Sequence, residues 1–169
     1  MRVRMRMIPL VGWRRRDASS AGSKAALLRE VLRPAPFEER ALRELASCLA
    51  EVEVPAGTVL ARQGQPSRQL GLLVEGTATL SRGGQPLTVL GPGDIVGEAA
   101  VLGPGPEWAT VATRTPTRLL VAGVGDRRAL QDHPALVRQL AGRLRDRLRD
   151  ALTPPRAARP AAVDRRAAS

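Results

Sequence analysis

The residues of this chain that are best suited to chemistry lie between positions 93 and 111. Gly97 and Glu98 precede a short apolar run that predicts a helix beginning near Glu98. The first N–H groups of such a helix have no partner within the helix and attract anions. Gly97 permits a close approach of the backbone to a bound group. This stretch therefore predicts a site for an anionic group, and residues 106–111 add a carboxylate, Glu107, a few positions later.

Catalytic and metal-binding side chains are scarce in the rest of the chain. Cys48 is the only cysteine and His133 the only histidine, which disfavours an internal disulfide, a histidine-based metal site and a Ser/His/Asp triad. A single cysteine also fits a reducing, cytoplasmic location. We expect Cys48 to be buried on a helix face and His133 to cap or turn the chain at a helix boundary. We expect no enzymatic activity and no required cofactor.

The net charge of +11 is concentrated at the two ends of the chain. Residues 1–33 carry a net charge of +7 and residues 153–169 a net charge of +3, which leaves +1 for the segment between them. We expect residues 1–23 to form a basic disordered arm and residues 153–169 a disordered tail rich in Ala, Arg and Pro. The apolar run in the arm is too short to span a bilayer. It also lacks a signal-peptide cleavage pattern.

Predicted helices flank the middle of the chain. Residues 36–50 carry apolar side chains at three- and four-residue spacing and predict an amphipathic helix, with a shorter helix around residues 27–32 before it. Asp126 is placed to cap a short helix that runs to residue 131. A longer helix is predicted over residues 134–152, with an apolar stripe that must dock on the rest of the domain or on a second copy of itself.

Short apolar runs separated by Gly- and Pro-containing turns fill the region between these helices. Many short strands at such intervals predict an antiparallel sandwich or β-roll. Gly83 and Gly84 predict a two-residue hairpin turn. The predicted strands are residues 52–54, 58–61, 70–74, 77–81, 87–90, 95–96, 109–113 and 117–121.

The order of motifs resembles the cyclic nucleotide-binding domain family over about residues 34–152. Residues 97–102 match the G-E-x-A-x-L half of the family's phosphate-binding cassette, and residues 106–111 match its P-R-x-A-T-V half except at Glu107. Lesser motifs occur in the family's order. Residues 54–60, 62–66, 72–76 and 90–94 resemble P-x-G-x-x-L, R-E-G-D, a strand ending in S-G, and L-x-P-G-D. The resemblance implies a mainly β domain over residues 24–152. It would be a jelly-roll-like antiparallel β-roll with an N-terminal helix pair and two C-terminal helices.

The resemblance also implies a ligand site. In the family's arrangement Glu98 would accept a hydrogen bond from the ribose hydroxyl, Ala99 and Ala100 would donate backbone N–H groups to the phosphate, and Thr110 would face the phosphate or base. The family places its phosphate-binding arginine where this chain has Glu107. The candidate ligand-binding residues are Gly97, Glu98, Ala99, Ala100, Glu107, Trp108, Ala109 and Thr110.

Three outcomes remain open for the cassette. Glu107 points to solvent and leaves a weak nucleotide site; or Arg62, Arg82 or Arg114 replaces the missing arginine; or the pocket is empty or adapted to a neutral or cationic ligand. Trp108, at a position where the family has a small residue, would fill or cover the pocket or provide a stacking surface.

Three functions follow from these outcomes. We rank a non-catalytic regulatory or interaction domain with a degenerate cassette slightly above a working sensor of cAMP or cGMP. A module that binds nucleic acid or membranes through its basic arm ranks well below both. A protein partner or a homodimer would use the helix at residues 134–152. No transmembrane segment is expected. The family's transcription factors carry a helix-turn-helix after the long helix, and residues 153–169 leave no room for such a DNA-binding domain.

Overall fold

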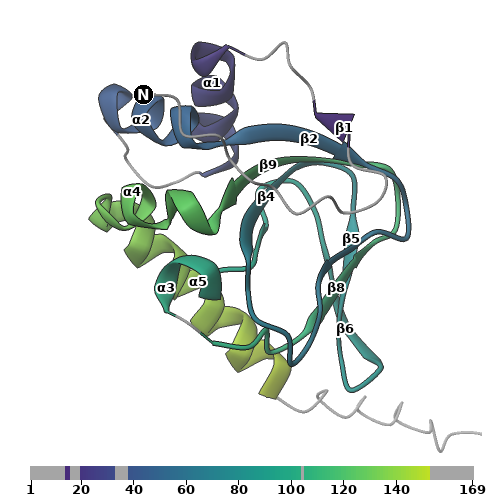
Figure 1. Ribbon diagram of the computed structural model, residues 1–169. Coiled ribbons are helices and arrows are strands. Elements are labelled where there is room, and N and C mark those ends of the chain that lie inside the picture. The colour runs from purple at the N-terminus through teal and green to yellow at the C-terminus, as the bar shows by residue number, and fades with distance from the viewer. Residues whose placement is uncertain (1–13, 16–19, 33–37, 104, 153–169) are drawn as a thin grey trace, which may run out of the picture.

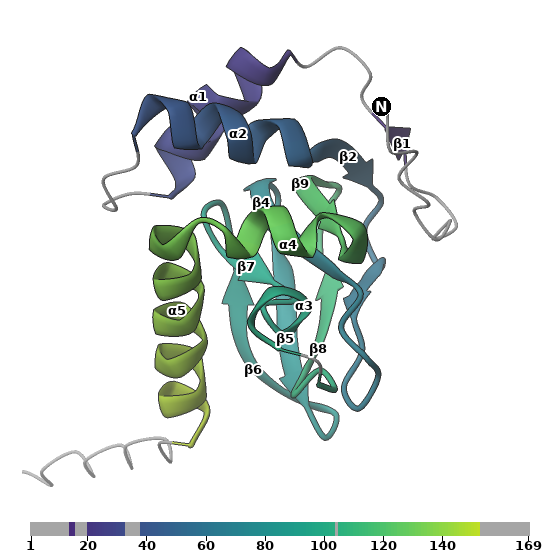
Figure 2. The same ribbon diagram turned by 60° about the vertical axis from the view of Figure 1, so that its left-hand side comes forward.

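The computed structural model describes residues 14–15, 20–32, 38–103 and 105–152 (Figure 1). Two antiparallel sheets form a β-roll, and helices cover one side and one end of it (Figures 1 and 2). The predicted fold class is therefore confirmed, including the N-terminal helix pair and the two C-terminal helices. No helix within the described ranges is long and apolar enough to cross a bilayer.

Nine strands within the described ranges build the two sheets. In the five-stranded sheet the order is β1-β2-β9-β4-β7, and in the four-stranded sheet it is β3-β8-β5-β6. All eight predicted strands are present, with ends that differ by up to two residues. The strands are β1 Arg14–Arg15, β2 Ala50–Val54, β3 Val59–Ala61, β4 Gln69–Glu75, β5 Ala78–Arg82, β6 Gln85–Leu90, β7 Ile95–Val96, β8 Thr110–Thr113 and β9 Thr117–Gly123.

The hairpin between β5 and β6 turns at the predicted glycine pair. Gly83 and Gly84 have φ angles of 56° and 81°, a region in which side chains with a Cβ are strained. The adjacent strands pair from Arg82 with Gln85 to Ala78 with Leu90. The turn residues therefore set the register of this hairpin, as the sequence predicts.

Five α-helices and one short 3-10 helix, Val124–Asp126, complete the described chain. The α-helices are α1 Ala21–Val31, α2 Glu39–Cys48, α3 Ala99–Leu102, α4 Arg127–Gln131 and α5 Pro134–Leu152. Ser20 caps α1 by accepting a hydrogen bond from the Ser23 N–H at 3.1 Å. α1 starts at Ala21 and β1 pairs with β2, so the described structure includes parts of residues 1–23, the predicted basic arm. The rest of the predicted arm and the whole predicted tail lie outside the described residues.

Two predicted roles in the helices need correction. Asp126 occupies the position before α4, but its side chain makes no capping bond. It accepts a hydrogen bond from the Gly123 N–H at 3.2 Å and so closes the end of β9 instead. Cys48 is only partly buried at the end of α2. His133 does lie at a helix boundary, where its N–H donates to the Leu130 carbonyl oxygen at 3.2 Å.

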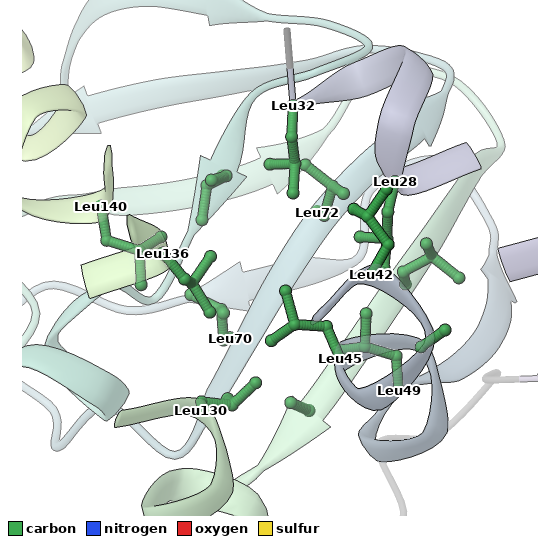
Figure 3. Close-up of a cluster of buried hydrophobic side chains, with 14 of the residues drawn as sticks. Leu28, Leu32, Leu42, Leu45, Leu49, Leu70, Leu72, Leu130, Leu136 and Leu140 are labelled. Carbon is green, nitrogen blue, oxygen red and sulfur yellow. The ribbon is translucent and has the colours of Figure 1, made fainter. Parts of the chain in front are cut away.

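Alternation along the central strands gives the protein two cores. Leu120 and Ala122 of β9 face the helices, whereas Leu119 and Val121 face the interior of the roll, as the two-residue period of a strand requires. The helix-side core is built mainly of leucines from α1, α2, β4, α4 and α5 (Figure 3). α5 is thereby packed on the roll through Leu136 and Leu140, and this docking fixes which of its polar residues reach the cassette.

Candidate functional site

The first half of the cassette is a tight turn between a strand and a short helix. β7 pairs with β4, and Gly97 then leads into α3 with a φ of +79°. A Cβ added at Gly97 would lie 1.9 Å from the carbonyl oxygen of Gln69. Only glycine fits this position, because the neighbouring backbone occupies the space of a side chain. Ser67 also contacts the turn by donating a hydrogen bond to the Gly97 carbonyl oxygen at 3.3 Å.

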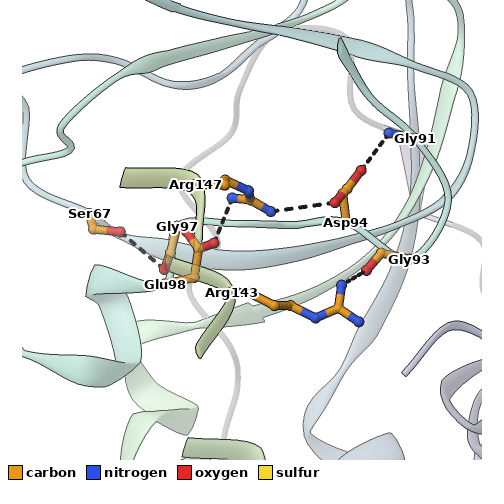
Figure 4. A network of polar contacts seen from close by, with 8 residues as sticks. All are labelled: Ser67, Gly91, Gly93, Asp94, Gly97, Glu98, Arg143 and Arg147. Atoms are coloured by element: carbon orange, nitrogen blue, oxygen red, sulfur yellow. Dashed lines mark hydrogen bonds and ion pairs between the residues drawn. The ribbon is translucent and has the colours of Figure 1, made fainter. Parts of the chain in front are cut away.

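Glu98 is buried, with 3% of its surface exposed, and forms an ion pair with α5. Arg147 Nη1 donates to Glu98 Oε1 at 2.6 Å (Figure 4). Arg147 Nη2 lies 3.7 Å from Asp94 Oδ1, which is close enough for an ion pair but too far for a hydrogen bond. The neighbouring Arg143 donates to the Gly93 carbonyl oxygen. The last turns of α5 are therefore held against the cassette by two arginines.

Burial sets the proton affinity of this group of residues. It raises the pKa of Glu98 above the ordinary value for a glutamate, and the positive charge of Arg147 acts in the opposite direction. Burial likewise lowers the pKa of Arg143, against the effect of Asp94. The carboxylate of Glu98 is thus costly to ionise in this environment, and Arg147 is the main group that stabilises its charge.

Glu107 lies in the second half of the cassette, where its backbone is fixed by two hydrogen bonds. Its N–H donates to the Gln65 carbonyl oxygen, and its own carbonyl oxygen accepts from the Gly64 N–H, both at 2.8 Å. The residue is 8% exposed. Burial raises the pKa of Glu107, and the nearby Ser67 hydroxyl acts in the opposite direction. Glu107 is therefore buried as a residue and lines the cavity described next, and the three outcomes for the cassette remain predictions.

A cavity of about 230 Å³ lies beside Glu107. Among the described residues, no basic side chain forms an ion pair with Glu107. The cavity is lined by Val59, Leu60, Ala61, Arg62, Gln65, Pro66, Arg68, Gln69 and Glu107.

The remaining cassette residues are mostly committed to the fold. Trp108 is partly buried against the core inside the roll, and Ala109 belongs to that core. The hydroxyl oxygen of Thr110 accepts a hydrogen bond from the Gln63 N–H at 3.0 Å. The Ala100 N–H donates to the Gly97 carbonyl oxygen at 3.0 Å. Ala99 is the first residue of α3 and is half-buried.

The arginine that reaches the cassette is not one that the sequence singled out. Arg62 lines the cavity but forms no ion pair with Glu107, and Arg82 and Arg114 are exposed. Arg147 comes instead from α5, more than 30 residues beyond the cassette. A signal for it existed: Arg143 and Arg147 continue the helical spacing of the buried Leu136 and Leu140 and so share their side of the helix.

The fold and this site define a class of protein: a β-roll domain with a strand–turn–helix cassette and a C-terminal helix that contacts the cassette. The family model of the cyclic nucleotide-binding domain matches residues 51–132. The chain belongs to this family.

The chain is similar to several known proteins of this class. It is 31% identical over 121 residues to the CRP-like cAMP-activated global transcriptional regulator of Mycobacterium tuberculosis, a match that covers 66% of this chain and 53% of the regulator. It is 35% identical over 121 residues to the acetyltransferase Pat of Mycolicibacterium smegmatis, covering 68% of this chain and 35% of that enzyme. The structure of the N-terminal domain of a transcriptional regulator from Streptomyces coelicolor is 30% identical, with a TM-score of 0.56 over 72% of this chain and 94% of that domain. The chain thus spans about half the length of the regulator and about a third of the length of the acetyltransferase.

Proposed function

We propose that this chain is a non-catalytic regulatory or interaction domain in which the inverted charge of the cassette makes cyclic nucleotide binding weak or absent. The observation that carries the proposal is the buried residue Glu107, which stands at the family's phosphate-arginine position without a basic partner among the described residues. A cyclic nucleotide carries one negative charge, and at this position the family supplies a positive one.

The size of the effect follows from the distance between charges. Two unit charges about 4 Å apart interact by about 4 kcal/mol at an effective dielectric constant near 20. Replacing arginine by glutamate removes one such attraction and adds one such repulsion when Glu107 is ionised. A quarter of the combined change is about 2 kcal/mol, which weakens binding more than tenfold.

Glu98 adds a second obstacle. By resemblance its carboxylate is the acceptor for the ribose hydroxyl, but here it already accepts from Arg147 at 2.6 Å. A ribose hydroxyl would share or replace that hydrogen bond. Glu98 is therefore present as in the family, but it is hydrogen-bonded to α5.

Calorimetry with cAMP and cGMP tests the proposal. We expect no binding heat for the unaltered chain at millimolar nucleotide, and micromolar affinity would contradict the proposal. The variant Glu107→Arg should raise the affinity at least about tenfold, because it restores the phosphate counter-charge. Arg114→Gln, which alters an exposed arginine away from the cavity, is the matched control and should change nothing.

The second candidate function is sensing of a cyclic nucleotide with Arg147 in place of the missing arginine. One observation favours it: Arg147 Nη2 is buried and has no hydrogen-bond acceptor within the described part of the chain. Buried donors of this kind are rare and usually have a partner in the functional state. A phosphate oxygen would supply that partner.

The two candidates differ in what Arg147→Gln does to binding. If Arg147 holds the phosphate, the unaltered chain binds a cyclic nucleotide and the variant loses that binding. If the cassette is degenerate, neither form binds. In both cases the contact between Glu98 and Arg147 links the cassette to α5, so we propose that α5 is the element through which the domain acts on a partner or a second copy. Leu144 and Leu148 on α5 are only partly buried and are the residues to alter in tests of association.

A further inference from the structure

The three buried glutamates of the described chain differ in their partners. Glu51 is 3% exposed and accepts from Arg118 Nε at 2.5 Å, and Glu98 is equally buried and accepts from Arg147. Glu107 is 8% exposed, and its carboxyl has no ion pair within the described ranges; the nearby Ser67 hydroxyl donates to the Gly97 carbonyl oxygen. A buried carboxylate without a cation is costly. The fold therefore supplies a cation to two of its buried glutamates and leaves the third facing a cavity.

The cavity beside Glu107 has the shape and lining of a site for a small molecule. Its volume of about 230 Å³ is below the range of about 300–1,000 Å³ that is usual for drug-sized ligands, so its occupant would be the size of an amino acid. β3 contributes an apolar wall of Val59, Leu60 and Ala61. Gln65 and Gln69 add amide groups that can donate and accept hydrogen bonds.

Charge is arranged at separate places around this cavity. Glu107 is buried as a residue, whereas Arg62 and Arg68 are exposed, and neither arginine forms an ion pair with it. The lining therefore presents a negative group and two positive groups that are not paired with one another, which suits a ligand that carries both signs of charge.

We propose that this cavity binds a small guanidinium-containing zwitterion, with its guanidinium group on Glu107 and its acidic group toward Arg62 and Arg68. The inference rests on the proposed loss of cyclic nucleotide binding and names the chemistry of what the altered site accepts. A guanidinium donates two parallel hydrogen bonds to a carboxylate and so fits Glu107 well. The apolar wall of β3 then contacts the methylene groups that join the two charged ends.

Three probes separate the two charged contacts in calorimetry on the full chain near neutral pH. L-arginine carries both groups, agmatine lacks the carboxylate, and L-citrulline replaces the guanidinium by a neutral group of similar shape. We expect L-arginine to bind, agmatine to bind more weakly, and L-citrulline to bind at least about tenfold more weakly than L-arginine. The absence of binding by L-arginine at millimolar concentration, or equal binding of L-citrulline, would overturn the proposal.

Variants assign each contact to its residue. Glu107→Gln should weaken both L-arginine and agmatine at least about tenfold, while Glu107→Asp, which keeps the charge, should retain part of the affinity. The double variant Arg62→Gln, Arg68→Gln should lower the affinity for L-arginine and should not lower the affinity for agmatine, whose ammonium group the two arginines repel. Glu30→Gln, on the exposed face of α1, is the matched control. Unchanged binding in Glu107→Gln would overturn the proposal, and thermal unfolding of each variant confirms that it is folded.

Failure of this inference and failure of the proposed function give different results. Tight binding of cAMP to the unaltered chain would refute the degenerate cassette. Failure of both cAMP and L-arginine to bind would refute only the zwitterion site. Glu107→Arg joins the two tests, because it should lose L-arginine and gain cyclic nucleotide in the same protein.

Discussion

The ion pair between Glu98 and Arg147 is the contact whose removal should most affect stability. In the variant Arg147→Gln the carboxylate of Glu98 loses its cation while it remains buried, with 4% of its side chain exposed. At a charge separation of about 4 Å and an effective dielectric constant near 20, the lost attraction is about 4 kcal/mol. Removal of one partner of a buried ion pair commonly costs about 3–5 kcal/mol. We therefore expect Arg147→Gln to lower the free energy of unfolding by about 3–4 kcal/mol near pH 8.

The pH dependence of this loss has a definite sign. Burial raises the pKa of Glu98, and Arg147 opposes that shift, so the variant raises the pKa further. As the pH falls through the raised pKa, Glu98 takes up a proton and no longer needs a cation. The loss caused by Arg147→Gln should therefore shrink between pH 8 and pH 5.

Urea unfolding at the two pH values measures this loss. Arg145→Gln is the matched control, because Arg145 lies on the exposed side of the same helix, and it should cost less than about 0.5 kcal/mol. Adding Glu98→Gln to Arg147→Gln should restore much of the stability, since no buried charge remains. A loss equal to that of Arg145→Gln, or one that does not change with pH, would refute the reasoning.

Three further perturbations test other parts of the site and its support. Glu107→Gln should be more stable than the unaltered chain by roughly 1–3 kcal/mol near pH 8. A raised pKa means that the folded state favours protonated Glu107, so the unaltered chain loses stability as the pH rises above the ordinary glutamate value of 4.5. The stability advantage of Glu107→Gln should therefore vanish near pH 4, as measured by urea unfolding. Gly97→Ala should cost at least about 2 kcal/mol, because its Cβ would lie 1.9 Å from the Gln69 carbonyl oxygen at a φ of +79°. Gly91→Ala is the control, because a Cβ at Gly91 would meet open space, and it should be close to neutral. Thermal unfolding of both variants measures the difference. Leu140→Ala, at a fully buried position of α5, should cost about 2–5 kcal/mol and loosen α5 in hydrogen exchange.

The strands and helices were predictable because their signals are local. Glycine pairs at positive φ, such as Gly83 and Gly84, mark turns that no other residue fills easily. The leucine spacing of α5 marks the side that packs on the roll. These signals depend on neighbours in sequence, so the chain order alone reveals them.

The charge arrangement of the site was predictable only in part. The sequence shows that Glu107 replaces an arginine, but it does not show whether the side chain is buried, because that depends on the segment around Gln65. It also does not show which arginine reaches the cassette. Arg147 does so through the angle at which α5 docks, and that angle is a result of packing between distant leucines. The prediction that Asp126 caps α4 was wrong for a similar reason, because its carboxylate accepts from the Gly123 N–H at the end of β9 instead.

The cassette residues that are most typical of the family have structural roles that do not depend on a ligand. Gly97 is required by the backbone of Gln69, Ala109 fills the core of the roll, and Glu98 holds α5 through Arg147. Their presence would therefore be expected in a domain that has kept the fold and lost the nucleotide. The carboxyl of Glu107 has no such structural role among the described residues, and the desolvation of its charged form lowers the stability of the folded state. A residue that costs stability and faces a cavity is better explained by what the cavity binds than by what the fold needs, so the identity of the ligand should be sought from Glu107 rather than from the motifs around it.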